Sequence, residues 1–356
     1  MPVFVWLAVG AVLAAARFSW QGFRAPIDVE VYVQGGRLLL SGQNLYAADV
    51  PVTGTELPFT YPPFAAMVFA MVAWLPMPLV IVLHHAGMVA CAWLVVRWLR
   101  LSPYWLVLML LLQPSFDSLT FGQINFFLMT LVLADAYGHR PRWLPRGALT
   151  GIAAAIKITP AIFLLWFLLR RDTRGLVGMV GAAGLTTSLA AVLKPHDSWY
   201  YFTEALWTPA RVGDVAYLQN ASLRGVLARM GQGDLVPLVL AVVLIGAGMA
   251  IWRCPDEVWS VVLTAGLGLL LSPISWTHHF TWLIVLVALP QCPSWLRWWG
   301  LVAMSAGMLL TSNQGILGAF AVAQYPLIVV VSFVITDAGC GASPQRGTTA
   351  PETAGC

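Results

Sequence analysis

Two carboxylates stand one residue apart near the start of the chain, shortly after an apolar segment. Asp28 and Glu30 are conspicuous because only 15 of the 356 residues are aspartate or glutamate. A carboxylate held beside a substrate can accept the proton of an attacking hydroxyl group, and we expect Asp28 to be such a base. Its alternative role is to cap a helix N-terminus, where aspartate is favoured. Glu30 is expected to be an interfacial charge or a partner of the site.

Other polar side chains stand at the breaks between apolar runs. Amides, cations and histidines suit a polyhydroxylated substrate that ends in a phosphate. A phosphate ester leaves as an anion, so cations and histidine donors are sufficient to stabilise it, and neither a metal nor another cofactor is expected. The candidate binding residues, besides Glu30, are Tyr61, Gln123, Asn125, Lys157, Arg211, Asn220, Arg224, His278 and His279.

Each of these residues also has a structural alternative. Lys157 could extend its charge toward water along an apolar stem, although a lysine beside a proline break in apolar sequence favours function. His278 and His279 could belong to an interfacial aromatic belt. Arg211 and Arg224 could bind the headgroups of surrounding lipids.

Composition sets the class of protein that must position these groups. Hydrophobic residues make up 59% of the chain and charged residues 10%, against about a quarter charged in soluble proteins. The sequence therefore predicts an integral membrane protein whose partners include lipids. The basic residues form no stripe, which argues against nucleic-acid binding, and the five scattered cysteines have neither metal spacing nor an expected disulfide.

Charge asymmetry predicts the topology, because short loops rich in arginine stay in the cytoplasm. We expect an all-α, polytopic bundle with about 12 spanning helices, both termini inside and the polar breaks outside. Residues 1–335 would form one membrane domain and residues 336–356 a disordered cytoplasmic tail, with residues 2–16 in an uncleaved first helix. The cytoplasmic arginines are Arg97, Arg100, Arg140, Arg142, Arg146, Arg170, Arg171, Arg174, Arg253 and Arg297.

Two apolar runs do not fit a simple span. Residues 63–75 are too few to cross about 30 Å of hydrocarbon, so they are expected to form a re-entrant or juxtamembrane helix in the first outer loop. Residues 147–170 are split at Lys157 by Pro160. Unsatisfied backbone at membrane depth is tolerated where it lines a polar cavity, which is what we expect here.

An ordered set of motifs resembles glycosyltransferase family 87, a branch of the GT-C membrane transferases. The motifs are Ile-Asp-Val-Glu-Val-Tyr-Val at 27–33, Phe-Thr-Tyr-Pro-Pro-Phe at 59–64, Gly-Gln-Ile-Asn at 122–125, Lys-Ile-Thr-Pro at 157–160 and Ser-Pro-Ile-Ser-Trp-Thr-His-His at 272–279. The resemblance implies that Asp28 is the catalytic base and that the histidine pair lies by the donor phosphate or the acceptor. One departure is Ala221, where the family's pattern has glutamine; Gln219 could replace it.

Within that family the chain looks most like the actinobacterial α-(1→2)-mannosyltransferases. These use polyprenyl-phosphate-mannose to extend phosphatidylinositol mannosides or lipoglycans. The resemblance implies inverting transfer in the plasma membrane, with the site facing the extracytoplasmic side. Two alternatives stay open: an arabinofuranosyltransferase using decaprenyl-phosphate arabinose, and a lipid or sugar transporter, which would also have intramembrane charges and broken helices.

Overall fold

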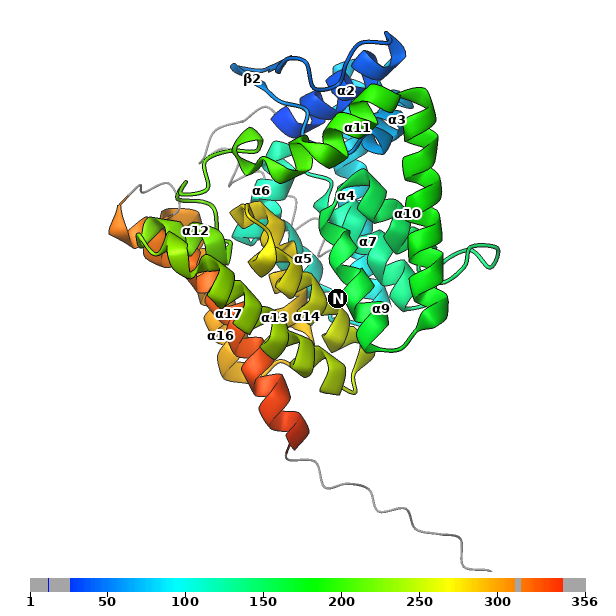
Figure 1. The fold of residues 1–356 in the computed structure, drawn as a ribbon. Coiled ribbons are helices and arrows are strands. Elements are labelled where there is room, and N and C mark those ends of the chain that lie inside the picture. The colour runs from blue at the N-terminus through cyan, green and yellow to red at the C-terminus, as the bar shows by residue number, and fades with distance from the viewer. Residues whose placement is uncertain (1–11, 13–25, 311–314, 342–356) are drawn as a thin grey trace, which may run out of the picture.

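The computed structural model describes residue 12 and residues 26–310 and 315–341, and in these residues the protein is almost entirely helical (Figure 1). A short antiparallel hairpin, which the all-α prediction did not include, adds two strands of three residues each. The predicted first helix at 2–16 lies outside the described residues. The first half of the chain forms α2 (Ile27–Leu40), β1 (Val50–Val52), β2 (Thr55–Leu57), α3 (Pro63–Ala70), α4 (Met77–Trp98), α5 (Tyr104–Leu111), α6 (Gln113–Phe121), α7 (Asn125–Ala136), α8 (Ala148–Ile156), η1 (Thr159–Ile162) and α9 (Phe163–Leu169).

The second half begins with a long helix and ends with another. Its elements are α10 (Thr173–Leu193), α11 (Pro195–Thr203), η2 (Ala205–Trp207), η3 (Pro209–Arg211), α12 (Leu223–Arg229), η4 (Gly233–Leu235), α13 (Val236–Arg253), α14 (Glu257–Leu271), η5 (Thr277–Phe280), α15 (Thr281–Ala288), α16 (Ser294–Leu310) and α17 (Ile316–Gly341). Helix α17 continues past residue 336, where the tail was expected to begin. The rest of the predicted tail, 342–356, lies outside the described residues.

Four helices among the described residues are long and apolar enough to cross a membrane. They are Met77–Trp98, Thr173–Leu193, Gly233–Arg253 and Ile316–Asp337, and the count reaches five if α6 and α7, bent by 115°, form one broken span. The chain is therefore a multi-pass membrane protein, but the predicted 12 spans are not found. The reason is visible in the breaks, since α5, α8, α9 and α15 each stop within 7 to 9 residues.

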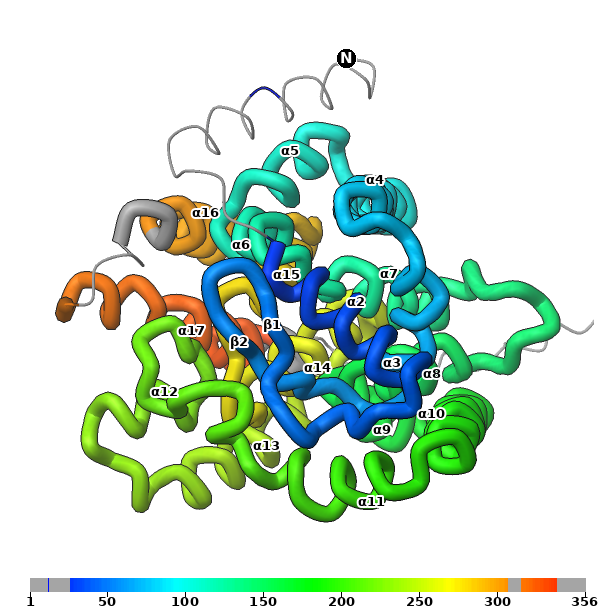
Figure 2. Tube along the Cα trace, turned by 90° about the horizontal axis from the view of Figure 1, so that it is seen from above, coloured from blue at the N-terminus to red at the C-terminus, as the bar shows by residue number. Residues whose placement is uncertain are grey.

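A cap layer covers one end of the bundle. Figures 1 and 2 show α2, the hairpin, α3 and α11 lying across the ends of the long helices. Helices α2 and α3 pack closely because Gly36 lacks a side chain: a Cβ there would lie 2.7 Å from the backbone nitrogen of Ala70. With eight residues, α3 extends about 12 Å at 1.5 Å per residue, which fits the expected juxtamembrane helix rather than a span.

Two breaks in the bundle bring polar backbone under this cap. Helix α6 ends at Gly122, whose φ of +72° is in the left-handed region and which lies against α2, since a Cβ there would be 2.3 Å from Cγ2 of Val29. Helix α8 ends at Lys157, an extended residue, and Pro160 then starts a short 3-10 turn. The predicted split of residues 147–170 at Lys157 is thus present.

The opposite end of the bundle collects the basic connections (Figure 1). Arg146, between α7 and α8, pairs with Asp172 before α10 and, at 2.7 Å, with Glu257 at the start of α14. Arg253, at the end of α13, pairs with Asp337 of α17 at 2.6 Å. Loops far apart in sequence therefore share one basic face, away from the cap.

Candidate active site

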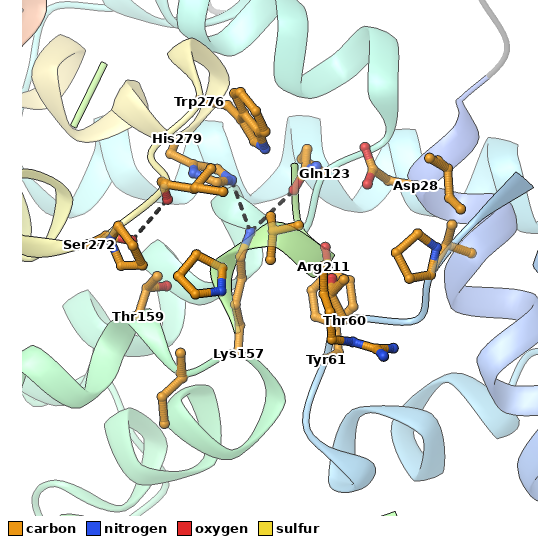
Figure 3. A pocket seen from close by; sticks show the side chains of 18 of the residues that line it. Asp28, Thr60, Tyr61, Gln123, Lys157, Thr159, Arg211, Ser272, Trp276 and His279 are labelled. Atoms are coloured by element: carbon orange, nitrogen blue, oxygen red, sulfur yellow. Dashed lines mark hydrogen bonds between the residues drawn. The ribbon is translucent and has the colours of Figure 1, made fainter. Parts of the chain in front are cut away.

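A cavity of about 400 Å³ opens between the cap layer and the broken helices. Seven of the residues singled out from the sequence line it: Asp28, Tyr61, Gln123, Lys157, Arg211, His278 and His279. Figure 3 shows side chains from the cap, from the α6–α7 corner and from the late turn before α15 pointing toward one space. Among the described residues that line the cavity, Asp28 is the sole carboxylate, and the four lysine, arginine and histidine side chains there are basic.

Asp28 lies in the first turn of α2 but does not cap it. The N-cap position is Pro26, and no side chain makes a capping hydrogen bond there, so the capping alternative is wrong. The side chain is partly buried at the cavity wall, and burial raises the pKa of Asp28 to about 6, although the Lys157 charge and a hydrogen bond with Gln123 oppose the rise. A carboxylate with this pKa is a stronger base than an ordinary aspartate and is still ionised at neutral pH.

Lys157 is held by three acceptors, one for each of its N–H bonds. Its Nζ donates to Oε1 of Gln123 at 3.3 Å, to Oδ1 of Asn125 at 3.3 Å and to Nε2 of His279 at 3.4 Å. Gln123 lies between this ammonium group and Asp28, as Figure 3 shows, and its side chain hydrogen-bonds to both. The lysine is therefore fixed inside the site instead of reaching for bulk water.

The two histidines are in different environments. His278 is 7% exposed and packs edge-on against Phe121, with ring centroids 5.4 Å apart. Neither of its ring nitrogens has a hydrogen-bond partner among the described residues. Buried imidazole nitrogens without partners are costly, and the His278 side chain that carries them is part of the cavity wall. His279 instead directs Nε2 to Lys157. An aromatic belt does not describe this pair, since both rings line the cavity.

Four predicted residues are not found in the cavity wall. Glu30 accepts hydrogen bonds from the backbone nitrogen of Thr53 at 2.6 Å and from its hydroxyl at 2.8 Å, so it holds the hairpin. Arg224 lies on α12 away from the cavity. The other two residues, Asn125 and Asn220, support the wall from behind.

The two asparagines fix the late turn. Asn125 donates to the backbone oxygen of His278 at 2.8 Å, which leaves its own oxygen facing Lys157. Asn220 donates to the oxygen of Pro273 at 3.1 Å and accepts from the nitrogen of Ser275 at 2.9 Å. Gln219, which could replace the glutamine that the family's pattern has at position 221, lines the cavity.

Several lining residues were not selected from the sequence. One of them is Tyr201 of α11. Its neighbour Tyr200 does not line the cavity, but its hydroxyl accepts a hydrogen bond at 3.0 Å from Arg211, which was selected from the sequence. Tyr217 contacts Trp276 edge-on at 5.7 Å between centroids. Thr159 and Trp276 stand within the quoted motifs, so a signal for them existed. Tyr201 and Tyr217 lie in a long segment without periodicity, and only the fold brings them to the site.

The arrangement combines one base with a set of cations and hydrogen-bond donors. Asp28 is on the α2 side, while Lys157, Arg211 and the histidines come from three other elements. Such a site can deprotonate a hydroxyl group at one end and stabilise a departing anion at the other.

Comparison with known proteins agrees with this chemistry. The family model of glycosyltransferase family 87 matches residues 59–273. Two polyprenol-phosphate-mannose-dependent α-(1-2)-phosphatidylinositol mannoside mannosyltransferases are similar to the chain: that of Mycobacterium tuberculosis is 36% identical, over 82% of this chain and 77% of its own length, and that of Mycolicibacterium smegmatis is 34% identical, over 87% and 81%.

A third relative is the M. tuberculosis α-(1-2)-phosphatidylinositol pentamannoside mannosyltransferase, which is 33% identical over 79% of this chain and 69% of its own length. No solved structure matches. Both the family model and these relatives cover the α6–α7 corner, the break at Lys157 and the start of the late turn, the parts of the chain that carry most of the cavity. The chain therefore belongs to glycosyltransferase family 87.

Proposed function

We propose that the protein transfers mannose from polyprenyl-phosphate-mannose to a mannosylated glycolipid or lipoglycan, such as a phosphatidylinositol mannoside, forming an α-(1→2) linkage. The single observation that carries the proposal is the lone carboxylate facing a basic wall across one cavity. The names of the family members add the donor and the acceptor class.

Asp28 is the general base in this mechanism. It accepts the proton of an acceptor hydroxyl group as that oxygen attacks C1 of the β-mannosyl phosphate. The bond between C1 and the phosphate oxygen breaks, and polyprenyl phosphate leaves with the electron pair. Attack on the face opposite the leaving group inverts C1 and gives the α-linked product.

The basic wall binds the donor phosphate. His278 offers ring nitrogens that no described residue engages. Arg211 reaches the cavity from η3, and Lys157 contributes its charge from a fixed position. Because the cavity is partly shielded from water, these charges stabilise the growing negative charge on phosphate more strongly than exposed groups would. Nζ of Lys157 lies over the ring of Tyr61, 5.7 Å from the ring centroid, so Tyr61 supports the same wall.

The cap and its cavity face the extracytoplasmic side of the plasma membrane in this proposal. The arginine-rich connections gather at the other end of the bundle, where the Arg146 and Arg253 ion pairs join them. Short basic loops are retained in the cytoplasm, so the cap must lie outside.

Conversion of Asp28 to asparagine tests the proposal. With radiolabelled polyprenyl-phosphate-mannose and a phosphatidylinositol mannoside acceptor, D28N should lower kcat by about 10²–10⁴-fold, because the amide cannot accept the proton. Donor binding should persist. The fold should also persist, because removing a charge whose pKa is raised by burial does not cost stability at neutral pH.

Glu56→Gln is the matched control, since Glu56 is an exposed cap carboxylate on β2, and it should retain the parent rate. A D28N enzyme as active as the parent would refute the mechanism. Transfer from decaprenyl-phosphate arabinose but not from the mannosyl donor would favour the arabinosyl alternative and overturn the proposed substrate.

A further inference from the structure

Behind the active site lies a second, much smaller cavity of about 40 Å³. Lys157, Thr159 and His279 line both cavities and so form the partition between them. The rest of the small chamber is mainly apolar, built by α7, η1, α14 and the start of α15, and Thr281 provides a hydroxyl group there.

The hydrogen bonds of Lys157 determine the protonation of His279. All three N–H bonds of the ammonium group are directed to acceptors, and Nε2 of His279 is one of them. Nε2 must therefore carry a lone pair, and in a neutral imidazole the proton then resides on Nδ1. Nδ1 is thus a buried donor that needs an acceptor.

The described residues offer none. Nδ1 of His279 and Oγ1 of Thr281 are both buried, and neither has a hydrogen-bond partner among the residues that the structure describes. Thr281 is 1% exposed. His279 and Thr281 both line the small chamber, and each carries one orphaned polar atom. Such a pair of residues is a common sign of an internal water molecule, which needs a space of about 10–15 Å³ and two or more polar partners.

We propose that the small chamber holds a buried water molecule that accepts from Nδ1–H of His279 and hydrogen-bonds to the hydroxyl group of Thr281. Through this water Thr281 is a positioning residue: it supports the His279 tautomer that the Lys157 contact requires, and so keeps Nε2 directed at Lys157 and the ammonium group at the wall of the large cavity. Thr281 itself touches neither donor nor acceptor, since it does not line the large cavity.

Thr281→Val tests the proposal because valine keeps the branched shape and removes the hydroxyl group. Its kinetic readout rests on the proposed mannosyl transfer. Loss of the partner that orients a metal-bound histidine costs about 10–100-fold, and we take the same range for this histidine, so KM for the donor should rise within it, with a smaller change in kcat. Thr281→Ser, which restores the hydroxyl group, should return KM to near the parent value.

Thr264→Val is the matched control, since Thr264 is equally buried but donates only to the backbone oxygen of Ser260 within its own helix. A cryo-electron microscopy map that resolves ordered water supplies a readout independent of activity: density at Nδ1 of His279 should be present in the parent and in Thr281→Ser and absent in Thr281→Val.

An empty chamber in the parent map, or a Thr281→Val enzyme with the parent's KM, would overturn the water site. If the parent shows the water but transfers no mannose from the donor, the proposed function fails and the site stands.

Discussion

At the scale of single residues, the environment of Asp28 makes activity depend on pH in a definite direction. Burial raises its pKa to about 6, and a carboxylate in the proposed role of general base can accept a proton only when it is ionised. Transfer should therefore increase as the pH rises through about 6 and level off above it, whereas an exposed aspartate would give this limb near pH 4. The measurement is kcat/KM for the acceptor between pH 4.5 and 8.

Lys157→Met should shift the rising limb of this pH profile. The lysine charge stabilises the Asp28 carboxylate and holds its pKa down, so removing the charge should move the limb to higher pH and also weaken donor binding. Lys194, the other lysine of the chain, lies at the C-terminal end of α10. Lys194→Met should leave the limb in place, and an unmoved limb in Lys157→Met would contradict the electrostatic coupling.

Residue types predicted only some of the side chains that line the cavity. Asp28, Lys157 and the histidines could be selected because charged groups between apolar runs are expensive unless they have a use. Glu30 and Arg224 have the same chemistry but face elsewhere. The direction of a side chain depends on which neighbours its helix packs against, and spacing alone does not give this information.

At the scale of elements, the α6–α7 corner is what brings Gln123 to Asp28. Gly122→Ala should disrupt it for two reasons: its φ of +72° is unfavourable for alanine, and the new Cβ would lie 2.3 Å from Val29, the neighbour of Asp28. We expect a loss of more than about 1 kcal/mol in the free energy of unfolding, and up to about 10²-fold in activity if α2 moves by an ångström.

Gly138→Ala separates these two causes. Gly138 has the same φ of +72° but no atom within 4 Å of an added Cβ. Gly138→Ala should lower the free energy of unfolding by the backbone cost alone, about 1 kcal/mol, and should keep the activity of the parent. Thermal unfolding in detergent together with the transfer assay makes the comparison, and equal behaviour of the two variants would contradict the packing argument.

The sequence identified breaks more reliably than spans. Pro160 ends the helix before it for a local reason, the missing N–H and the ring, so the split at Lys157 was predictable. The hairpin and the short turns at 205–211 have weaker local signals, Gly54 with a φ of +84° and Pro209, and their positions depend on packing against α2 and α11. The number of membrane crossings was inferred from charge and apolar length together, and the structure divides that apolar length among shorter helices.

At the scale of the whole molecule, the two ends of the bundle should face opposite sides of the membrane. In a background without the five native cysteines, Ser41→Cys on the cap should react with a membrane-impermeant maleimide in intact cells. Trp143→Cys, 80% exposed in the basic connection between α7 and α8, should react only after permeabilisation. The reverse pattern would place the active site in the cytoplasm.

The contacts of Arg146 have a consequence for how the protein is made. Its partner Glu257 lies 111 residues further along the chain, so the translating ribosome delivers the first half long before this ion pair can form. The basic end of the bundle must therefore close late in biogenesis, and an alanine at position 146 should reduce the yield of inserted protein rather than the turnover of those molecules that mature.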